Sequence, residues 1–398
     1  MLNKINNLLF LITFWFLIIF VKLSYLFLIP CIFYKRLKKS KRNRILFLSP
    51  FFENNAGYQY RSKIWSELLN KNGFNSVVKN ALSEKQFKNL KSKGNLNQFH
   101  LFFFIKRYFQ VLSSIKYHKV IVRRELLLFN DYGNLFLDKL LLLIHPNAIL
   151  DYDDNISEAK REPKKISWFG YLLLENDSKF IKSIKIYKNF ICGSNYLKEL
   201  NHKLNPGANS IFIPTCVNYD KFPKKTYTDS PIVKLGWIGG IDNLKYLDPI
   251  INDLNEVNKT KKIELIIISG KDYNNSNALF PINNIKWSIN TQISNLYKID
   301  IGLMPLPINE RTKGKCGFKA IQYMGLGIPC IATSITANND IIDHRINGYL
   351  VKEHDWRKAF YEIFNQDISK LGDQARIKVT NNFTFNSNLK KYIEFLKG

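Results

Sequence analysis

The chain has 398 residues, of which 46% are hydrophobic and 14% aromatic, and its formal net charge at pH 7 is +27. Such an apolar composition excludes a wholly disordered chain, and the length fits two domains of ~150–180 residues with an appendage. The positive charge is compatible with nucleic acid, an anionic membrane surface or an anionic substrate as partner, or with a lysine-rich codon bias alone.

Cysteine spacing indicates the redox state of the protein. No C-x-x-C pair occurs, and the histidines show no metal-ligand spacing. We therefore expect reduced thiols in the cytosol, and neither a disulfide framework nor a metal site. The five cysteines are Cys31, Cys192, Cys216, Cys316 and Cys330.

Residues 8–34 form an apolar segment that is long enough to cross the ~30 Å of hydrocarbon in a bilayer. No small-residue cleavage site follows it, whereas seven basic residues follow at positions 35–44. We predict that residues 1–43 are a membrane anchor with a basic flank, and that the rest of the chain lies in the cytoplasm. Lys22 would cost ~2.5–3.5 kcal/mol in mid-membrane. A hairpin or an interfacial helix is therefore the alternative.

The first folded domain is predicted to begin with a strand at 44–49. A loop containing Gly57 follows, and then an amphipathic helix whose apolar stripe spans 64–69 and which ends at Gly73. This is the opening unit of a doubly wound α/β domain, although the dinucleotide fingerprint G-x-G-x-x-G is absent.

Alternating strand and helix patterns continue along this domain and predict a parallel sheet. The expected strands are 74–78, 118–123, 148–152, 187–192 and 210–213, and the expected helices include 98–115 and 134–144.

Polar clusters follow two of these strands, where ligands gather in parallel sheets. Arg123, Arg124 and Glu125 follow one strand, and the run DYDD at 151–154 ends the next. For DYDD the residues leave three roles open. It could bind a metal, cap the next helix while pairing with arginines, or contact a ligand.

A polar segment at 219–231, rich in lysine and proline, is predicted to link this domain (44–218) to a second one (232–383). The second domain opens with a strand at 233–240 that ends in a glycine turn, then a helix at 244–257 and a strand at 263–269. Further elements are expected at 285–287, 293–298, 300–303, 349–351 and, in a C-terminal segment (384–398) that packs back on the first domain, 386–396.

The stretch 314–334, GKCGFKAIQYMGLGIPCIATS, reads as a basic loop, a helix, a tight turn at Gly327 and a buried strand. A basic loop that feeds a helix N-terminus suits a diphosphate, because free N–H groups and the helix dipole favour negative charge there. Lys313, Lys315 and Lys319 add positive charge to this loop.

This stretch resembles the donor-binding motif of family 4 glycosyltransferases, in the variant K-C-G-F-K-x-x-Q-Y-M. The commoner motif has two glutamates, and here Gly314 and Gln322 occupy their positions. The family also places a basic pair after the first strand of the second domain, where this chain has Gly240 and Lys245. The resemblance extends from about residue 44 to 396, and it includes Tyr60-Arg61-Ser62 and the two polar clusters.

The resemblance implies a GT-B fold, α/β, with two Rossmann-like domains that face each other across a cleft. It implies transfer of a hexosyl-type sugar from a nucleotide-diphosphate sugar with retention, with neither metal nor cofactor, to a glycan or lipid-linked acceptor at a membrane. The implied catalytic residues are Lys245, Lys315, Asp154 and Glu125. The implied donor residues are Gly239, Gly240, Lys245, Arg311, Lys313, Lys315, Gly317, Phe318, Lys319 and Gln322. The implied acceptor residues are Gly57, Tyr60, Arg61, Arg123, Arg124 and Asp153.

Alternatives remain open for single residues and for the whole chain. Arg61 could be a solvated helix residue, and Lys245 a surface lysine on a first helical turn. The glycines at 240 and 314 are also compatible with a catalytically lapsed scaffold of a polysaccharide assembly complex. Nucleic-acid binding is disfavoured because no recognised motif accompanies the charge. A GT-B epimerase would need catalytic carboxylates and histidines that the sequence does not place.

Overall fold

The computed structural model describes residues 2–37, 43–86, 96–127, 135–155, 179–352 and 354–398. The chain divides into two compact units. Unit 1 comprises residues 1–193, 197–212 and 395–398, and unit 2 comprises 194–196 and 213–394. Each unit is an α/β fold built on one parallel sheet of six strands. The domain bounds and the cleft expected from the sequence remain predictions.

The sheet of unit 1 has the strand order β2-β1-β3-β4-β5-β6. Its strands are short apolar runs, as a sheet that is covered on both faces requires. Their positions confirm the sequence-based strands to within one or two residues at each end. The bounds are β1 (Arg44–Ser49), β2 (Asn75–Asn80), β3 (Lys119–Arg123), β4 (Ile149–Tyr152), β5 (Asn189–Cys192) and β6 (Asn209–Phe212).

The first predicted helix of unit 1 has an unexpected start. It begins with a short turn, α2 (Ala56–Tyr58), continues as a π-helical turn, η1 (Gln59–Lys63), and becomes regular in α3 (Ile64–Lys71). Other helices of the unit are α5 (Leu96–Leu112), η2 (Ser113–Lys116), α6 (Phe136–Ile144), α8 (Lys179–Ile186) and most of α9 (Asn195–Leu204).

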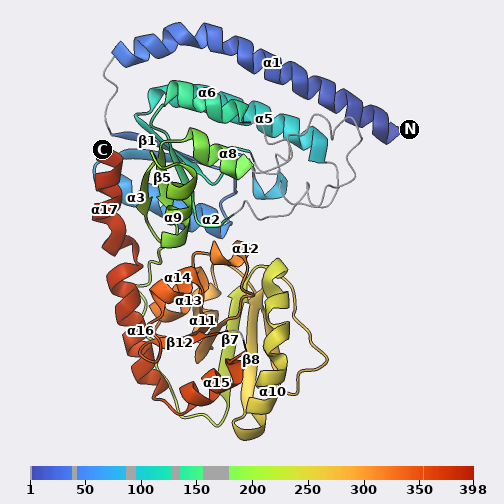
Figure 1. Ribbon diagram of the computed structural model, residues 1–398, viewed down its shortest axis with the longest axis vertical. Coiled ribbons are helices and arrows are strands. Elements are labelled where there is room, and N and C mark those ends of the chain that lie inside the picture. Colours follow the sequence, from blue (N-terminus) through green and yellow to red (C-terminus); the bar gives the residue numbers. More distant parts are fainter. Residues whose placement is uncertain (1, 38–42, 87–95, 128–134, 156–178, 353) are drawn as a thin grey trace. The chain divides into compact units, whose positions relative to one another are not determined.

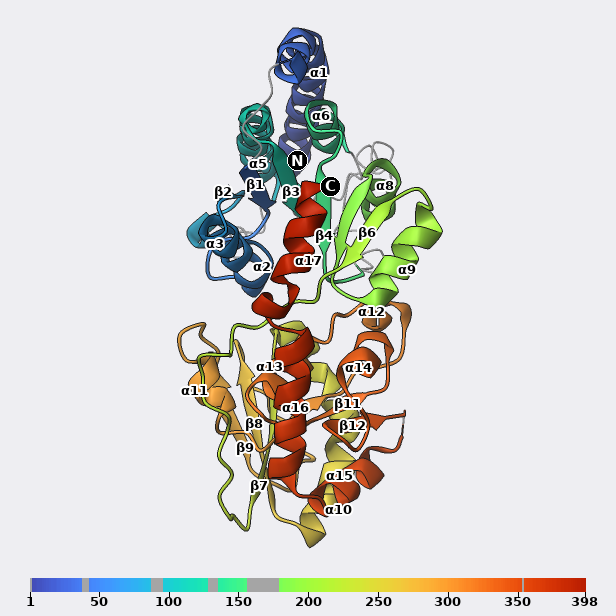
Figure 2. The ribbon, with the colours of Figure 1, turned by 90° about the vertical axis from the view of Figure 1, so that its left-hand side faces the viewer.

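The N-terminal apolar segment forms one helix, α1 (Leu2–Leu37), which lies along α5 and α6 (Figures 1 and 2). The hydroxyl of Tyr25 donates a hydrogen bond to the carbonyl of Phe136 (2.8 Å), and the rings of Phe20 and Tyr108 meet edge to face. Within the described parts of the chain, no helix combines the length and the hydropathy of a membrane span. The transmembrane span predicted for residues 8–34 is therefore not confirmed; its helix contains Lys22 and Pro30.

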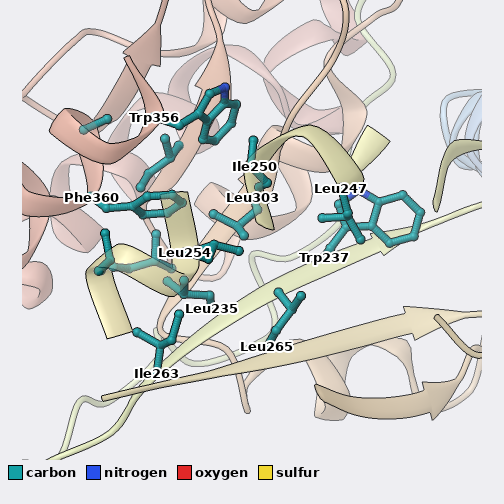
Figure 3. Packing of buried hydrophobic residues seen from close by; sticks show 14 of the residues in the cluster. Leu235, Trp237, Leu247, Ile250, Leu254, Ile263, Leu265, Leu303, Trp356 and Phe360 are labelled. Carbon is teal, nitrogen blue, oxygen red and sulfur yellow. The ribbon is translucent and has the colours of Figure 1, made fainter. Parts of the chain in front are cut away.

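The sheet of unit 2 has the order β12-β11-β10-β7-β8-β9. On one face of it, Leu235, Trp237 and Leu303 pack with Leu254 and Phe360 into a buried cluster (Figure 3). The strands are β7 (Val233–Gly239), β8 (Ile263–Ser269), β9 (Ile282–Lys286), β10 (Ile301–Met304), β11 (Cys330–Thr333) and β12 (Gly348–Val351).

The start of the helix predicted at 244–257 is wrong. Two 3-10 turns, η3 (Ile241–Tyr246) and η4 (Asp248–Ile250), come first, and the α-helix α10 (Ile251–Thr260) starts only after Pro249. Proline is tolerated in the first turn of a helix but not in its interior, which explains why α10 starts late. The remaining helices are α11 (Gln292–Leu296), α12 (Glu310–Lys313), α13 (Phe318–Gly325), α14 (Thr336–Ile341), α15 (Trp356–Phe364), α16 (Ile368–Asn382) and α17 (Phe385–Lys397).

The polar segment 219–231 contains no helix or strand and packs on unit 2. Lys225 is buried, and its ammonium lies 3.1 Å from Asp300 and donates to the carbonyl of Tyr297 (2.7 Å). The hydroxyl of Tyr227 donates to the carbonyl of Gly327 (2.8 Å). These contacts fix the segment against the turn that ends α13.

Candidate functional site

The basic loop between β10 and α13 is held by side chains that bind its backbone. The hydroxyl of Thr333 accepts from the N–H of Leu306 (2.9 Å) and donates to its carbonyl (3.0 Å). Thr312 is fully buried and forms a capping box with Asn309 at the start of α12. The hydroxyl of Thr336 donates to the carbonyl of Lys313 (2.6 Å). The loop is thus preorganised at the carboxyl end of the sheet, where α/β proteins bind ligands.

Helix α13 begins at a glycine with a left-handed backbone. Gly317 has a φ of 68°, and a Cβ there would lie 2.2 Å from Cδ1 of Ile341, so no other residue fits without rearrangement. No side chain of the described residues caps this helix. The N–H groups of its first turn, which opens with Phe318, can therefore meet an anion, as the helix dipole also favours.

Lys319 lies in the first turn of α13 and reaches back to β7. Its ammonium nitrogen is 3.9 Å from the ring centroid of Trp237, a cation–π contact with a fully buried ring. Its Cε packs so closely on Gly239 that a Cβ on this glycine would lie 2.8 Å away. Burial, and next the charge of Lys315, hold the pKa of the Lys319 ammonium well below its ordinary value.

Gln322 lies one turn further along α13 and is 5% exposed. Its Nε2 donates to the hydroxyl of Tyr219 (3.4 Å). Its Oε1 has no hydrogen-bond partner among the described residues. An amide oxygen is a hydrogen-bond acceptor, so this atom is suited to accept a hydrogen bond from a ligand hydroxyl.

The other basic residues of the predicted donor site are more exposed. Lys245 lies on η3, with its ammonium 6.0 Å from the Tyr246 ring centroid. Lys313 forms an ion pair with Glu310 (2.7 Å), which satisfies part of its charge. Arg311 is exposed and Lys315 half-buried, and neither forms an ion pair with a described residue. Gly240 lies in open space, where a Cβ would meet nothing closer than Asn243 at 3.8 Å.

Together these elements form an anion-binding site in unit 2. The carboxyl ends of the neighbouring strands β7 and β10 bring the turn at 239–240 against the start of α13. Positive charge comes from Lys319 and Lys315, and the dipole of α13 adds partial positive charge at the helix terminus. This arrangement can bind a diphosphate and stabilise negative charge that grows on it.

A second polar cluster lies at the carboxyl ends of β1, β3 and β4 in unit 1. Arg61 on the π-helical turn is 1% exposed and forms a bidentate ion pair with Asp151 at the end of β4, with 3.2 Å from Nε to Oδ2. The alternative that Arg61 is a solvated helix residue is therefore wrong. Its contact with Asp151 makes it a structural support of the cluster.

Arg123 joins the same cluster from β3. Its Nη2 donates to Oδ1 of Asp153 (2.5 Å), and it also lies near Gly57, where a Cβ would be 3.5 Å from Nη2. Burial disfavours the ionised carboxyl of Asp153, but Arg123 and Arg61 outweigh this and lower its pKa. The backbone of Asp153 packs directly on Gly193, which leaves no room for a Cβ there.

The other predicted site residues of unit 1 differ in their surroundings. Arg124 has a left-handed backbone, with a φ of 62°, and its guanidinium lies 5.8 Å from the ring centroid of Phe51. Glu125 is buried and accepts a hydrogen bond from Lys179 (3.2 Å). Tyr60 is buried, and Asp154 is half-buried. The carboxylates of Asp151 and Asp153 are thus engaged by arginines, which favours the pairing role of DYDD over a metal-binding one.

Sequence reasoning overlooked several residues that position these sites. Trp237, Tyr219 and Thr312 contact or support the donor-site residues, and Lys179 binds Glu125. An apolar tryptophan in a strand gives no sign that a lysine 82 positions later will cover it, because that pairing depends on the tertiary fold.

Part of the chain matches a known protein family, and its fold resembles solved structures. Residues 233–367 match the family "Glycosyl transferases group 1", whereas no curated protein matches the sequence. The fold resembles a glycosyltransferase from Rickettsia africae, with 16% identity and a TM-score of 0.61 over 89% of this chain and 98% of the other. Anabaena HepE with UDP and glucose aligns at 12% identity and a TM-score of 0.60, covering 89% and 99%.

The catalytic domain of Arabidopsis starch synthase IV, bound to ADP and acarbose, aligns at 11% identity with a TM-score of 0.63, over 89% of this chain and 98% of that domain. At such identities the likeness shows the fold alone. This is the GT-B-like fold of two parallel α/β sheets, which confirms the expected fold class. The family match covers the sheet of unit 2 and helix α13, in which Lys319 lies. The chain therefore contains a glycosyltransferase group 1 domain, in residues 233–367.

Proposed function

We propose that the protein transfers a hexosyl-type sugar from a nucleotide-diphosphate sugar, and that unit 2 binds this donor. The observation that carries the proposal is the placement of Lys319. Its ammonium lies over the Trp237 ring at the start of α13, which no side chain of the described residues caps. Lys315 lies near enough to lower the pKa of Lys319, and Lys319 forms no ion pair with a described residue. Such a site is suited to two phosphates and poorly suited to a neutral ligand.

The donor would lie with its diphosphate at the start of α13 and a ribose hydroxyl at Oε1 of Gln322. Lys319, Lys315 and Lys245 would then neutralise the charge that develops on the leaving diphosphate as the glycosidic bond breaks. We propose that transfer retains the anomeric configuration and needs neither metal nor cofactor, because side-chain and backbone donors supply the positive charge. The bound UDP of HepE and ADP of starch synthase IV support a nucleoside diphosphate as ligand class.

The acceptor would bind to unit 1, at the cluster of Gly57, Tyr60, Arg123, Arg124 and Asp153. Arg61 would support this cluster through its ion pair with Asp151. We propose a glycan or lipid-linked acceptor and a role in cell-surface polysaccharide biosynthesis, with the protein at a membrane and its catalytic units in the cytoplasm. The apolar helix α1 and the basic residues that follow it support the membrane location.

A thermal-shift screen of the full chain against UDP, GDP, ADP, TDP and CMP, with and without EDTA, tests the proposal. We expect one nucleoside diphosphate to raise the melting temperature, with the same shift in EDTA. NMR spectroscopy of the product formed from the matching nucleotide sugar then reports the anomeric configuration. No shift with any nucleotide would contradict the proposal. Binding without turnover of the sugar would favour the lapsed scaffold, which Gly240 and Gly314 also suggest.

A further inference from the structure

Helix α1 is apolar around its whole circumference, and the protein covers one side of it. The covered side consists of Leu17, Val21, Ser24, Tyr25 and Leu28, which are buried or half-buried. Tyr25 and Phe20 contact α6 and α5 there. Their spacing of three and four residues places them on one face of the helix. Helix α1 is thus packed on unit 1 along one face.

The opposite side of α1 is exposed although it is equally apolar. We call Leu9, Ile12, Phe16, Ile19, Leu23 and Leu26 the outer stripe. They recur at alternating intervals of three and four, and each is exposed, Phe16 and Leu26 by about two thirds (67% and 66%). Soluble proteins seldom leave a contiguous apolar surface of this kind uncovered. An apolar partner is therefore expected on this side.

Helix α5 extends this surface. Its Phe102, Ile105 and Phe109 are exposed and lie on one face, again at intervals of three and four. Helix α5 packs against α1, where the ring centroid of its Tyr108 lies 6.0 Å from that of Phe20. The outer stripe and these three residues form what we call the apolar surface.

The charge around the apolar surface distinguishes between its potential partners. The chain carries a net charge of +27, and seven lysines and arginines lie at positions 35–44, which include the last turn of α1 and the residues after it. A second copy of this chain would bring equal positive charge to the interface, whereas an anionic lipid leaflet attracts it. Aromatic residues such as Trp15 and Phe27 are also exposed on α1, and aromatic side chains are typical of the boundary between water and acyl chains.

Lys22 fits a helix that lies flat. Its ammonium is 5.1 Å from the ring centroid of Phe136 on α6, which places it on the flank of α1 beside the protein. In that orientation the charge stays at the level of the lipid headgroups, whereas a helix that crossed the bilayer would carry it into the hydrocarbon. The side of α1 that packs on unit 1 would, moreover, have to leave the protein in a crossing helix.

We propose that the apolar surface of α1 and α5 docks the protein on an anionic lipid leaflet, with α1 lying in the plane of the membrane. The inference deepens the membrane location in the proposed function. It differs from the sequence-based prediction of a spanning anchor, because it places both ends of α1 on the same side of the bilayer. Docking in this way would keep the protein next to a lipid-linked acceptor.

Flotation of the full chain with preformed vesicles tests the docking. We expect binding to vesicles of phosphatidylcholine and phosphatidylglycerol, and weaker binding to phosphatidylcholine alone or at high salt. The double variant Phe16→Glu, Leu23→Glu should lower the vesicle-bound fraction by about tenfold or more, because charge on this face opposes insertion. The matched control Leu279→Glu, Ile377→Glu, at exposed apolar positions of unit 2, should bind as wild type does. Equal flotation of both variants would overturn the proposal.

Thiol labelling tests the orientation. In a Cys31→Ser background the remaining four cysteines are buried, so a membrane-impermeant maleimide reports added thiols. Asn7 lies near the N-terminal end of α1 and Asn43 beyond its C-terminal end, and Asn7→Cys and Asn43→Cys should both be labelled from outside on sealed vesicles. Protection of Asn7→Cys alone would show a crossing helix and refute docking in the plane. A wild-type dimer that binds no vesicles, and that Phe16→Glu, Leu23→Glu converts to a monomer, would identify the surface as an interface between copies.

The two proposals can fail separately. Vesicle binding needs no donor, and the thermal shift with a nucleoside diphosphate needs no lipid. The variant Phe16→Glu, Leu23→Glu should keep the wild-type nucleotide shift, which also shows that it is folded. If it loses flotation and keeps the shift, the docking inference is supported independently of catalysis.

Discussion

The ammonium of Lys319 lies 3.9 Å from the centre of the Trp237 ring, on the side where β7 ends in Gly239. Lysine and tryptophan come from different elements, α13 and β7, and their contact connects the glycine turn to the helix terminus. The lysine forms no ion pair with a described residue. A charge that is desolvated and lacks a counter-ion is typical of a site whose partner is a ligand.

The first prediction concerns the stability of Lys319→Met without ligand. Because the pKa of Lys319 is lower in the folded than in the unfolded chain, its charge opposes folding at pH 7, and this cost fades as the pH rises towards ~10.4. Methionine keeps the length and removes the charge. We expect the free energy of unfolding at pH 7 to rise by about 0.5–2 kcal/mol in urea denaturation.

Lys245→Met is the matched control for this measurement, because Lys245 is exposed. Its free energy of unfolding should stay within ~0.5 kcal/mol of wild type. A Lys319→Met protein that is clearly less stable than wild type would mean that the contact with Trp237 outweighs the cost of burial, and that Lys319 serves the fold.

The second prediction is a pH dependence of donor binding. A bound diphosphate favours the charged form of Lys319 and raises its depressed pKa, so binding takes up a proton when the free lysine is neutral. Affinity for a nucleoside diphosphate should therefore fall as the pH rises through the pKa of Lys319 in the free protein. Calorimetry in buffers of different ionisation enthalpy measures this uptake. Lys319→Met should take up fewer protons, and an unchanged uptake would assign the titration to another group.

The third prediction uses two adjacent glycines. A Cβ on Gly239 would lie 2.7 Å from the Trp237 ring and 2.8 Å from Cε of Lys319, whereas a Cβ on Gly240 meets nothing closer than 3.8 Å. Gly239→Ala should displace Lys319 and weaken nucleotide binding, by about 1–3 kcal/mol if the charged contact is lost. Gly240→Ala should bind as wild type does. Calorimetric titration compares the two, and equal affinities would mean that the packing at Gly239 is irrelevant to the donor.

The fourth prediction separates two carboxylates at the end of β4. Asp151→Asn leaves the buried Arg61 without its charged partner and should lower the free energy of unfolding by about 3–5 kcal/mol. Asp154 is half-buried, and Asp154→Asn should lower the rate of sugar transfer without changing stability or nucleotide affinity. Denaturation, titration and a transfer assay distinguish them. If Asp154→Asn unfolds the protein, the carboxylate has a structural role.

Much of the fold could be predicted from the sequence, because its strands are short apolar runs separated by turn signals. The strand 119–123 and the strand 330–333 illustrate this, each found within two residues. Where local chemistry competes, prediction was less accurate. Pro249 delays α10. The π-helical turn at 59–63 has no sequence signal, and its Arg61 pairs with Asp151, which is 90 positions away. Helices α15 and α16 were not predicted.

The candidate site was predictable in its residues but not in their environment. The motif placed Gln322 correctly on a helix, whereas Lys319, which was assigned to the preceding loop, lies in the first turn of that helix. Their contacts with Trp237 and Tyr219, which lie 82 and 103 positions away, depend on the tertiary fold, and no periodicity carries such information. Tertiary contacts also explain why residues 8–34 were predicted to be an isolated apolar segment, whereas α1 packs on α5 and α6 in the structure.

The most direct test of the account is a calorimetric titration of the full chain with the nucleoside diphosphate that the thermal-shift screen selects. Wild type should bind it without metal, and Lys319→Met should bind it about ten- to a hundredfold more weakly, which corresponds to ~1.5–3 kcal/mol for a hydrogen bond to a charged group. Equal affinities of wild type and Lys319→Met would contradict the assignment of the diphosphate to the start of α13.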